Sequence, residues 1–290
     1  MPLPPSRKFT FADLRSARKS GVKVPMLTCY DYTSARLMQQ ACVSMLLVGD
    51  SASNVVLGYP TTLPVSLSFM VEITAAVRRG APECLVMADM PFGSYQGSLD
   101  RGVRSVFRMV KSTGCDAVKL EAAESQTKLI KELADAGVAV VAHLGLRPQT
   151  VGLVGGYRYQ GRTAAEARQI VSLALQMQQA GAAGILLEAV PPEVSAAVVE
   201  QTNIPVIGCG AGPACHAHVV VTQDALGLSN HVPRFVPRLG DVAAPMSACF
   251  AEYVRQVQTQ EYPAKEHCYD MPPDERNKFQ VLGFKFQENV

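Results

Sequence analysis

The stretch Asp116-Ala117-Val118-Lys119-Leu120-Glu121 decides the fold. It has strand length, follows one segment with helical periodicity and precedes another, as a parallel strand covered by helices would. Alternate residues of a strand face the same side, so Lys119 and Glu121 share one face. Such strands are usually almost wholly apolar, and an unpaired buried charge is costly. The two charges at the end of this strand indicate a structural ion pair or a functional site, and we favour the site.

Short apolar runs alternate with helical segments on both sides of this strand. The runs predicted as strands are Val24–Thr28, Met45–Gly49, Cys84–Asp89, Asp116–Glu121, Val138–His143, Gly184–Glu188, Ile204–Gly208 and Val219–Thr222. The segments predicted as helices are Ser34–Cys42, Leu67–Arg79 (with Gly80 as its C′ cap), Leu99–Thr113, Glu124–Ala136, Ala164–Ala180 and Glu193–Gln201. This alternation predicts an α/β fold, a closed (β/α)8 TIM barrel. A doubly wound open sheet is the alternative, because the eighth strand has the weakest pattern.

Composition limits the domain organisation and the partners. The chain has 290 residues, 48% hydrophobic and 18% charged, which is enough for a large core. With no composition break, we predict one barrel domain over residues 1–260 and a polar C-terminal extension over 261–290, an appendage or an oligomerisation arm. The net charge of +2 is too small to indicate nucleic acid as a partner. No apolar run is long enough to predict a membrane segment, and the start of the chain lacks the apolar core of a secretory signal.

The cysteines and two neighbouring histidines give no metal-site pattern. Eight cysteines are spread from Cys29 to Cys268 without a CxxC pair. They are expected to be reduced and mostly buried in a cytoplasmic protein. His216 and His218 are two residues apart, and we expect them to be solvent-facing loop residues rather than metal ligands.

In a TIM barrel, function lies at the C-terminal ends of the strands. Ionisable residues stand at several of the predicted ends: Asp50, Asp89, Lys119, Glu121, His143 and Glu188. One aspartate after a strand is more often a helix N-cap than a ligand, but capping does not explain so many convergent groups. We therefore predict an active site at this mouth of the barrel.

The residue types indicate the chemistry of this site. Carboxylates without a His/Cys cluster suit Mg²⁺, and Asp50, Asp89 and Glu121 are its candidate ligands. A 2-oxo acid would complete the coordination through its keto and carboxylate oxygens, so that the ion stabilises an enolate.

The other charged groups of the mouth have roles around such an enolate. Lys119 would neutralise the substrate carboxylate or the developing oxyanion. Glu188 would be the general base that removes a proton α to the carbonyl. His143 either orients a substrate oxygen or is a satisfied core histidine.

Specific motifs run through nearly the whole chain. They are MLTCYDYTSA at 26–35, LLVGDS at 46–51, VVLGYPTTLPVS at 55–66, VRRGAP at 77–82, ADMPFGSY at 88–95, VKLE at 118–121, HLGLRPQTV at 143–151, GGYRYQGR at 155–162, LLEAVP at 186–191, IPVIGCGAG at 204–212 and DALGL at 224–228. In this order they resemble the 3-methyl-2-oxobutanoate (ketopantoate) hydroxymethyltransferase family. GCGAG alone would indicate only a tight turn after a strand.

The resemblance implies a barrel of the phosphoenolpyruvate mutase/isocitrate lyase superfamily. It implies Mg²⁺-dependent transfer of a hydroxymethyl group from 5,10-methylenetetrahydrofolate to 3-methyl-2-oxobutanoate, giving ketopantoate for pantothenate biosynthesis. By motif, the Mg²⁺ ligands would be Asp50, Asp89 and Glu121, the substrate contacts Asp50, Ser51, Asp89 and Lys119, and the base Glu188. Family members are large homo-oligomers, often decamers, which makes the C-terminal arm a candidate assembly element.

Three segments depart from the family pattern near the predicted strand ends. Ala52-Ser53-Asn54 follows GDS where the family has Leu-Gly-Met, and Ala122-Ala123 replaces Gly-Gly after KLE. Cys215-His216-Ala217-His218 stands where the family tends to have Cys-Asp-Gly-Gln. One hypothesis is the same enolate chemistry with another 2-oxo acid or, less favoured, another one-carbon donor. The competing explanation is neutral drift.

Two rival functions are weaker. A C–C lyase or phosphonate-forming mutase of the same superfamily would be expected to carry a reactive cysteine between Lys119 and His143, and none stands there. An inactive paralogue that serves as an assembly partner would be expected to have lost its acids, which are all present.

Overall fold

The chain folds as a closed barrel of parallel strands. In the computed structural model, which describes residues 7–156, 158–230 and 232–281, the strand order is β1 to β8 and β8 pairs back with β1. The strands are β1 (Val24–Thr28), β2 (Met45–Val48), β3 (Leu85–Asp89), β4 (Ala117–Glu121), β5 (Val140–Gly145), β6 (Gly184–Glu188), β7 (Val206–Cys209) and β8 (Ala217–Val220). The predicted (β/α)8 barrel is confirmed, and the open sheet is excluded.

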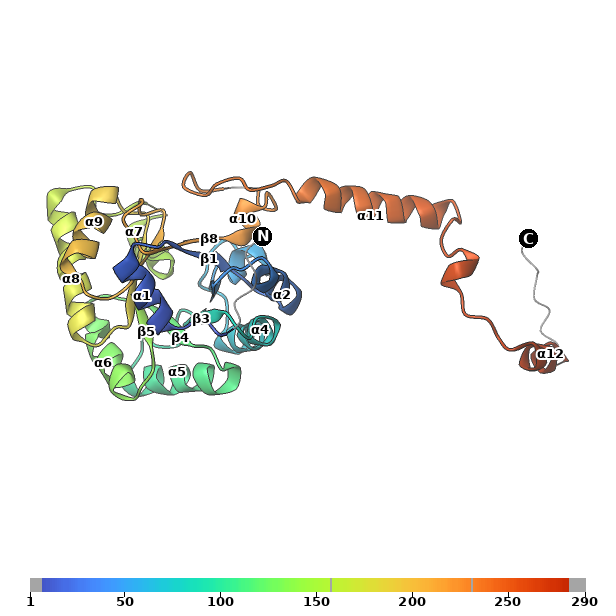
Figure 1. The fold of residues 1–290 in the computed structure, drawn as a ribbon, viewed down its shortest axis with the longest axis horizontal. Helices are drawn as coiled ribbons and strands as arrows, with labels where there is room; N and C mark the ends of the chain where they lie inside the picture. The colour runs from blue at the N-terminus through green and yellow to red at the C-terminus, as the bar shows by residue number, and fades with distance from the viewer. Residues whose placement is uncertain (1–6, 157, 231, 282–290) are drawn as a thin grey trace. The chain divides into compact units, whose positions relative to one another are not determined.

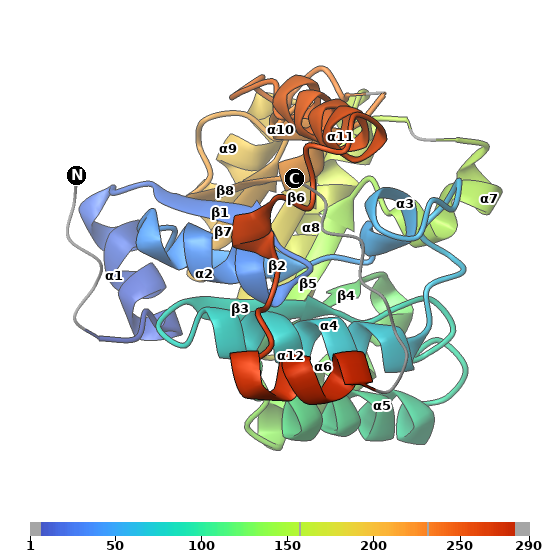
Figure 2. The ribbon, with the colours of Figure 1, turned by 90° about the vertical axis from the view of Figure 1, so that its right-hand side faces the viewer.

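Helices surround the strands (Figures 1 and 2). They are α1 (Phe11–Ser20), α2 (Tyr32–Gln40), α3 (Ala52–Val55), α4 (Leu67–Gly80), α5 (Leu99–Thr113), α6 (Thr127–Asp135), α7 (Val151–Val154), α8 (Ala164–Gln179), α9 (Pro192–Gln201) and α10 (Thr222–Ala225), with 3-10 turns η1 (Glu124–Gln126) and η2 (Pro148–Thr150). The longer predicted helices are all present, with ends that shift by a few residues. The short helices α3, α7 and α10 and the N-terminal helix α1 were not predicted.

The strands lie between two apolar clusters, because alternate residues of each strand face opposite sides of the sheet. Leu85 and Met87 of β3 belong to the cluster inside the barrel, whereas Val86 and Ala88 belong to the cluster between strands and helices. On β4, Ala117 is inside while Val118 and Leu120 are outside. Because the alternation continues along each strand, Asp89, Lys119 and Glu121 face the barrel interior at its C-terminal end.

Helix α1 closes the opposite end of the barrel. Its Leu14 is fully buried in the interior cluster with Met26 and Met45. Arg18 donates to the carbonyl of Thr202 at 2.9 Å, and the backbone N–H of Phe9 donates to the carbonyl of Glu83 at 2.7 Å. Both carbonyls precede strands, so α1 and its lead-in cover the N-terminal ends of the strands.

Gly80 is not the C′ cap that the sequence predicted. It is the last residue of α4, and Ala81 follows as the C-cap, with its N–H bonded to the carbonyl of Val77. A Cβ at Gly80 would lie 2.4 Å from the carbonyl oxygen of Tyr32 and 2.8 Å from Cβ of Ala35. The glycine is therefore required by the close approach of α2 and not by a left-handed backbone.

His216 and His218, in the third segment that departs from the family pattern, are also not where the sequence predicted. His216 is buried, and its Nδ1 accepts the backbone N–H of Val206 at 2.9 Å. His218 lies within β8 and is half-buried, because this strand begins two residues earlier than predicted. Both residues are at the N-terminal end of the barrel, so the prediction of solvent-facing loop histidines near the pocket was wrong.

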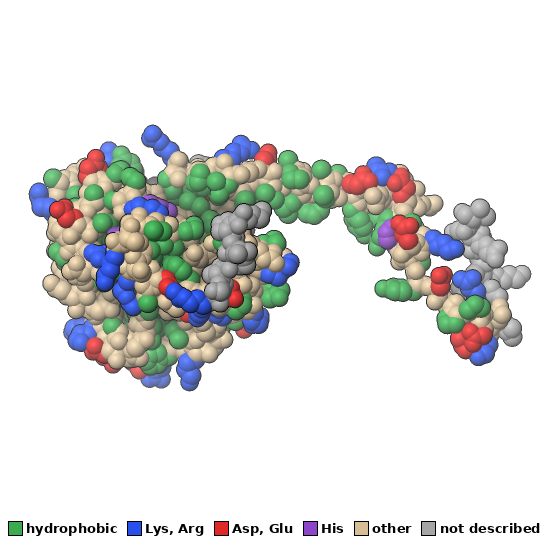
Figure 3. Space-filling model, viewed as in Figure 1, with side chains coloured by type: hydrophobic (Ala, Val, Ile, Leu, Met, Phe, Trp, Pro, Cys, Tyr) green, Lys and Arg blue, Asp and Glu red, His purple; other side chains and the backbone are tan. Residues whose placement is uncertain are grey.

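By its own contacts the chain divides into two units, with the barrel ending at Gly240 and the second unit beginning at Asp241. The second unit contains α11 (Ala243–Gln258), η3 (Lys265–His267) and α12 (Pro273–Val281). Apolar side chains are exposed along α11, as Figure 3 shows: Met246, Phe250, Tyr253, Val254 and Val257. The extension predicted from residue 261 lies inside this unit, after α11, and its boundary stays a prediction.

Two expectations about the whole chain concern cysteines and membranes. The cysteines all lie in the described residues and none forms a disulfide; Cys29, Cys84, Cys115 and Cys215 are buried, whereas Cys249 and Cys268 are exposed. No helix within the described ranges combines the length and the apolarity needed to cross a bilayer.

Candidate active site

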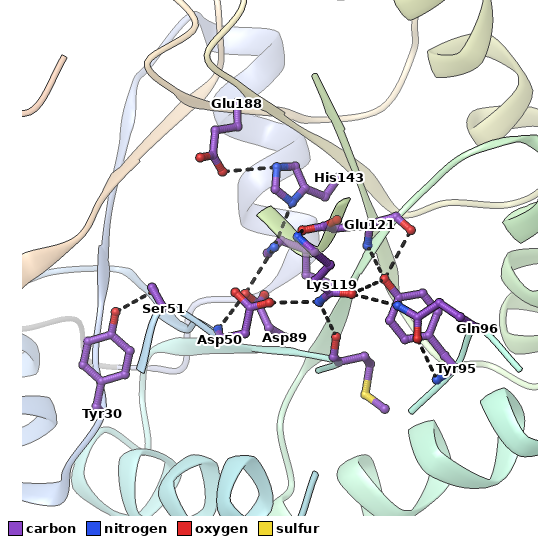
Figure 4. A network of polar contacts seen from close by, with 12 residues as sticks. Tyr30, Asp50, Ser51, Asp89, Tyr95, Gln96, Lys119, Glu121, His143 and Glu188 are labelled. Carbon is purple, nitrogen blue, oxygen red and sulfur yellow. Dashed lines mark hydrogen bonds and ion pairs between the residues drawn. The ribbon is translucent and has the colours of Figure 1, made fainter. Parts of the chain in front are cut away.

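The structure brings the six predicted ionisable residues together at the C-terminal mouth of the barrel (Figure 4). Asp50 follows β2, Asp89 ends β3, and Lys119 and Glu121 belong to β4; His143 comes from β5 and Glu188 ends β6. All are buried except Glu188, whose side chain is 20% exposed. Neighbouring strands place these residues side by side, with Asp89 opposite Lys119 and Glu121 opposite His143 in the register.

A chain of contacts joins four of these residues across β3, β4, β5 and β6 (Figure 4). Lys119 Nζ lies 3.2 Å from Asp89 Oδ2 and 3.0 Å from His143 Nδ1. The ammonium has only protons to donate, so Nδ1 accepts and the imidazole carries its proton on Nε2. Nε2 lies 3.2 Å from Glu188 Oε2, but it has no well-aligned hydrogen-bond partner among the described residues. The tautomer therefore directs an N–H toward the cavity and Glu188.

Burial shifts the pKa values at this mouth. It raises the pKa of Asp89 to about 7, that of Glu121 to about 8 and that of Glu188 to about 7, each against the opposing charge of Lys119. Burial opposes the charge of Lys119, but Asp89 and the other carboxylates outweigh it and raise its pKa. Burial and then Lys119 lower the pKa of His143 well below its usual value, so the imidazole is neutral. The charge of Lys119 thus does not offset the burial of these carboxyls, and additional positive charge would favour their ionised forms.

Glu188 sits on a tightly constrained backbone. Gly145 pairs with it in the register with φ of +86°, and a Cβ there would lie 2.4 Å from the carbonyl oxygen of Glu188. Ala189, directly after Glu188, has φ of +48°, a left-handed conformation that is uncommon for a residue with a side chain. Its N–H is held by the carbonyl of Cys209 at 2.9 Å. These contacts hold the main chain of Glu188 in place, and its carboxylate lies 3.2 Å from His143 Nε2.

Sequence reasoning assigned no role to Gln149, which lies at the centre of the polar network. Gln149 is in η2, inside the motif HLGLRPQTV, and is buried. Its amide donates to Asp50 Oδ2 at 2.9 Å, and its backbone N–H donates to Glu121 Oε1 at 2.8 Å. A polar residue in a motif next to the mouth was the available signal, but its side chain direction follows only from the fold.

Tyr30 was also missed. Its hydroxyl lies 2.8 Å from Oγ of Ser51, the residue predicted to contact the substrate (Figure 4). Tyr30 is buried, and burial raises the pKa of its phenol, so the hydroxyl keeps its proton. This pair fixes the orientation of the Ser51 hydroxyl at the edge of the cavity.

Polar and apolar side chains both line the cavity. The polar ones include Asp50, Ser51, Asp89, Lys119, His143, Glu188 and Asp224. The apolar ones include Leu47, Leu186, Cys209, Val219, Phe235 and Val236. A few polar groups among apolar ones are typical of small-molecule sites, because the polar groups orient a ligand whose apolar parts the rest of the lining covers.

None of the residues that depart from the family pattern is among the described residues that line this cavity. Ala122 is buried in the cluster between strands and helices, and Ala123 has φ of −134°, which costs an alanine nothing. Ser53 donates to the carbonyl of Thr61 at 2.7 Å, and Asn54 donates to that of Tyr59 at 2.8 Å. These described residues make loop and core contacts and do not line this cavity, although Ala122 lines a second pocket with Gly145 and Arg147.

The carboxylates fit a divalent cation. Within the described residues, no group of three His, Cys, Asp or Glu side chains is already assembled as a metal site. However, Asp89 Oδ1 and Glu121 Oε2 are buried without a hydrogen-bond partner among these residues, which is costly unless a ligand satisfies them. Buried carboxylate oxygens without a partner are the donor type that Mg²⁺ prefers.

Comparisons with known proteins show the family of this chain. The sequence profile described as ketopantoate hydroxymethyltransferase matches residues 8–265. The chain is 42% identical over 267 residues to the 3-methyl-2-oxobutanoate hydroxymethyltransferase of Geobacillus thermodenitrificans (strain NG80-2), covering 92% of this chain and 96% of that protein. It is 43% identical over 257 residues to the protein of the same name from Mycolicibacterium vanbaalenii, covering 88% of this chain and 91% of that one.

Solved structures share the fold at much lower identity. Phosphoenolpyruvate phosphomutase from Streptomyces platensis subsp. rosaceus superposes with a TM-score of 0.60 at 14% identity, covering 94% of this chain and 96% of that one. A 2,3-dimethylmalate lyase, described as a PEP mutase/isocitrate lyase superfamily member, has a TM-score of 0.57 at 16% identity, covering 94% of both chains. These likenesses support the barrel, while the profile and the sequence relatives decide the family. The chain belongs to the ketopantoate hydroxymethyltransferase family of enzymes.

Proposed function

We propose that this enzyme transfers a hydroxymethyl group from 5,10-methylenetetrahydrofolate to 3-methyl-2-oxobutanoate, giving 2-dehydropantoate (ketopantoate). The names of its relatives support the acceptor and the transferred group. The C3–H bond of the oxo acid breaks and C3 bonds to the methylene carbon of the donor. Both C–N bonds of that methylene carbon break, and water supplies the hydroxyl group. Tetrahydrofolate leaves with two N–H protons, one from C3 and one from the water. The observation that carries the proposal is the contact chain from Lys119 through neutral His143 to Glu188 beside the cavity.

Glu188 is the base in this proposal. Its pKa of about 7, raised by burial, leaves it substantially ionised at neutral pH and still able to take a proton from carbon. Lys119 stays charged and stabilises the negative oxygen that develops as the proton leaves. His143 accepts from Lys119 and presents its Nε2–H toward the cavity, where it can bind a substrate oxygen.

We propose Mg²⁺ as the cofactor, held by Asp50, Asp89 and Glu121, and Asp50, Ser51, Asp89 and Lys119 as the residues around the oxo acid. When bound, the ion supplies Lewis-acid polarisation of the keto group. The unpartnered oxygens of Asp89 and Glu121 support this assignment.

The acceptor is proposed to be that of the relatives rather than another 2-oxo acid. The hypothesis of an altered acceptor depended on the three changed segments, and their residues lie outside the described lining of the cavity. The lyase hypothesis expected a cysteine between Lys119 and His143. Cys209 does line the cavity from β7, but burial raises the pKa of its thiol well above the usual value, which disfavours a nucleophilic role.

We also propose that the enzyme is a cytoplasmic homo-oligomer. The cysteines form no disulfide, as expected in a reducing compartment. The exposed apolar residues of α11 support a role for the C-terminal part of the chain in assembly.

Proton exchange tests the chemistry without the folate donor. NMR of 3-methyl-2-oxobutanoate in D₂O with enzyme and Mg²⁺ should show loss of the C3 proton signal. EDTA should stop this exchange, and adding 5,10-methylenetetrahydrofolate should then convert the acid to ketopantoate. A series of 2-oxo acids that differ in their alkyl groups serves as the specificity control.

Each outcome separates the candidates. Exchange of 3-methyl-2-oxobutanoate faster than of the other acids supports the proposed acceptor. Exchange of only another acid would revive the altered-acceptor hypothesis. No exchange of any acid would contradict the proposed function and leave the lyase or the inactive paralogue.

A further inference from the structure

Gln149 uses both atoms of its side-chain amide and its backbone N–H within the mouth of the barrel. Its Nε2 donates to Asp50 Oδ2 and to the carbonyl of Met90, both at 2.9 Å. Its Oε1 accepts from the Tyr95 hydroxyl at 2.9 Å and from Gln96 Nε2 at 2.8 Å. Its backbone N–H donates to Glu121 Oε1 at 2.8 Å.

These partners allow one orientation of the amide. Turning it by 180° would place Oε1 against a carboxylate oxygen of Asp50 and the carbonyl oxygen of Met90, and three acceptors would face one another. The Tyr95 hydroxyl adds a constraint, because it also accepts the backbone N–H of Glu121 at 3.1 Å (Figure 4). The amide of Gln149 is therefore held through both its nitrogen and its oxygen.

The bonds of Gln149 connect three neighbouring strand ends. Asp50 follows β2, Met90 follows β3 and Glu121 ends β4, and these are the ends that carry the three carboxylates proposed to hold the cation. Gln149 occupies one oxygen of Asp50 and one of Glu121. On Glu121 the other oxygen, Oε2, stays buried without a hydrogen-bond partner among the described residues.

We propose that Gln149 is a positioning residue of the cation site, which holds Asp50 and Glu121 so that one oxygen of each is bound to Gln149 and the other is left for a divalent ion. The inference rests on the proposed function, because it takes these carboxylates as the ligands. Partners that orient metal ligands typically change affinity 10- to 100-fold when they are removed.

The test is the affinity for Mn²⁺, which prefers oxygen ligands as Mg²⁺ does and is visible by electron paramagnetic resonance. Full-length wild type and Gln149→Leu, both freed of metal, are titrated with Mn²⁺ alone. Leucine keeps most of the volume and removes the amide, so we expect Kd for Mn²⁺ to rise roughly 10- to 100-fold. In the exchange assay, the Mg²⁺ concentration at half-maximal rate should rise by a similar factor, while the rate at saturating Mg²⁺ recovers to within a few-fold.

Two further variants separate positioning from general damage. Gln39→Leu is the matched control, because Gln39 Oε1 accepts the backbone N–H of Glu83 at 2.9 Å near the N-terminal end of the barrel. It should leave the Mn²⁺ affinity unchanged. Tyr95→Phe removes the hydroxyl that fixes Gln149 and should weaken Mn²⁺ binding by a smaller factor than Gln149→Leu. If Gln149→Leu does not fold, Tyr95→Phe decides.

Equal Mn²⁺ affinities for wild type and folded Gln149→Leu would overturn the inference and leave the proposed function intact. Unchanged affinity in Tyr95→Phe, when Gln149→Leu is unfolded, would overturn it as well. A wild type that binds no Mn²⁺ would remove the metal from the proposed function, and this inference with it.

Discussion

Both ends of the barrel contain a buried histidine, an aspartate and a cation, and they use them differently. At the N-terminal end, His216 accepts a backbone N–H from Val206. At the C-terminal end, His143 Nε2 has no aligned partner among the described residues and faces Glu188 across 3.2 Å. The first histidine ties the loop before β8 to β7, and the second directs a hydrogen-bond donor into a cavity.

The aspartates differ in the same way. Asp116, directly before β4, accepts from Arg78 at 2.8 Å and from the backbone of Val86 at 2.9 Å, and it also pairs with Lys8. Asp89, at the end of β3, pairs with Lys119, but its Oδ1 has no partner among the described residues. Asp116 at the closed end thus has its carboxylate bound by the chain itself, whereas Asp89 at the open end keeps one buried oxygen without a partner among the described residues. The difference teaches that stability and function are separated along the barrel axis.

The largest expected effect is at the open end. Glu188→Gln removes the proposed base but keeps the shape of the side chain, so exchange of the C3 proton should fall by roughly 10²- to 10⁴-fold. The melting temperature should not fall, because the neutral amide avoids the cost of burying a charge. NMR exchange rates and thermal melts check both parts. Near-normal exchange would assign the base to another residue.

The pH dependence of exchange also tests Glu188 at the open end of the barrel. Burial raises the pKa of Glu188 to about 7, and the base acts only when deprotonated. The rate should therefore rise about tenfold per pH unit below this value and level off above it. Initial exchange rates from pH 5.5 to 8.5 at saturating Mg²⁺ measure this profile. A profile that is flat across neutral pH would show that Glu188 does not limit exchange.

The closed end should respond in stability instead. Asp116→Asn leaves Arg78 and Lys8 without their carboxylate, which we expect to lower the free energy of unfolding by roughly 1–3 kcal/mol. Exchange kinetics in the folded variant should stay within about twofold of wild type. Denaturant titrations compared with exchange rates test the separation. An Asp116→Asn variant that is as stable as wild type but exchanges the C3 proton more slowly would contradict this separation.

The smallest effect concerns His216. Burial, with Arg18 and Lys23, lowers the pKa of His216 from 6.5 to about 4, so the unfolded chain binds a proton more readily than the folded one. Stability from this group is present above pH 6.5 and is lost as the pH falls toward 4. His216→Asn keeps an acceptor for Val206 and removes the titration. Denaturant midpoints should fall less steeply with acid in the variant, with equal exchange rates at neutral pH.

Much of the fold and of the candidate site could be predicted from the sequence. The alternation in Asp116–Glu121 is local, so it indicates which residues share a face before any partner strand is known. In a parallel barrel the strand ends meet at one mouth, and this placed Lys119 beside Asp89 and His143 in advance. The family motifs then added the chemistry that spacing alone left open.

Contacts that cross the barrel were decided only by the tertiary structure. Gln149 and Asp50 are 99 residues apart, and no periodicity connects them. Leu14 has no visible reason to be a core residue until the closed barrel offers an apolar interior for α1 to cover. His216 looks like a loop residue until β7 lies beside it. Local pattern fixes which way a side chain points, but its partners depend on which distant segments the closing of the barrel brings within hydrogen-bond distance.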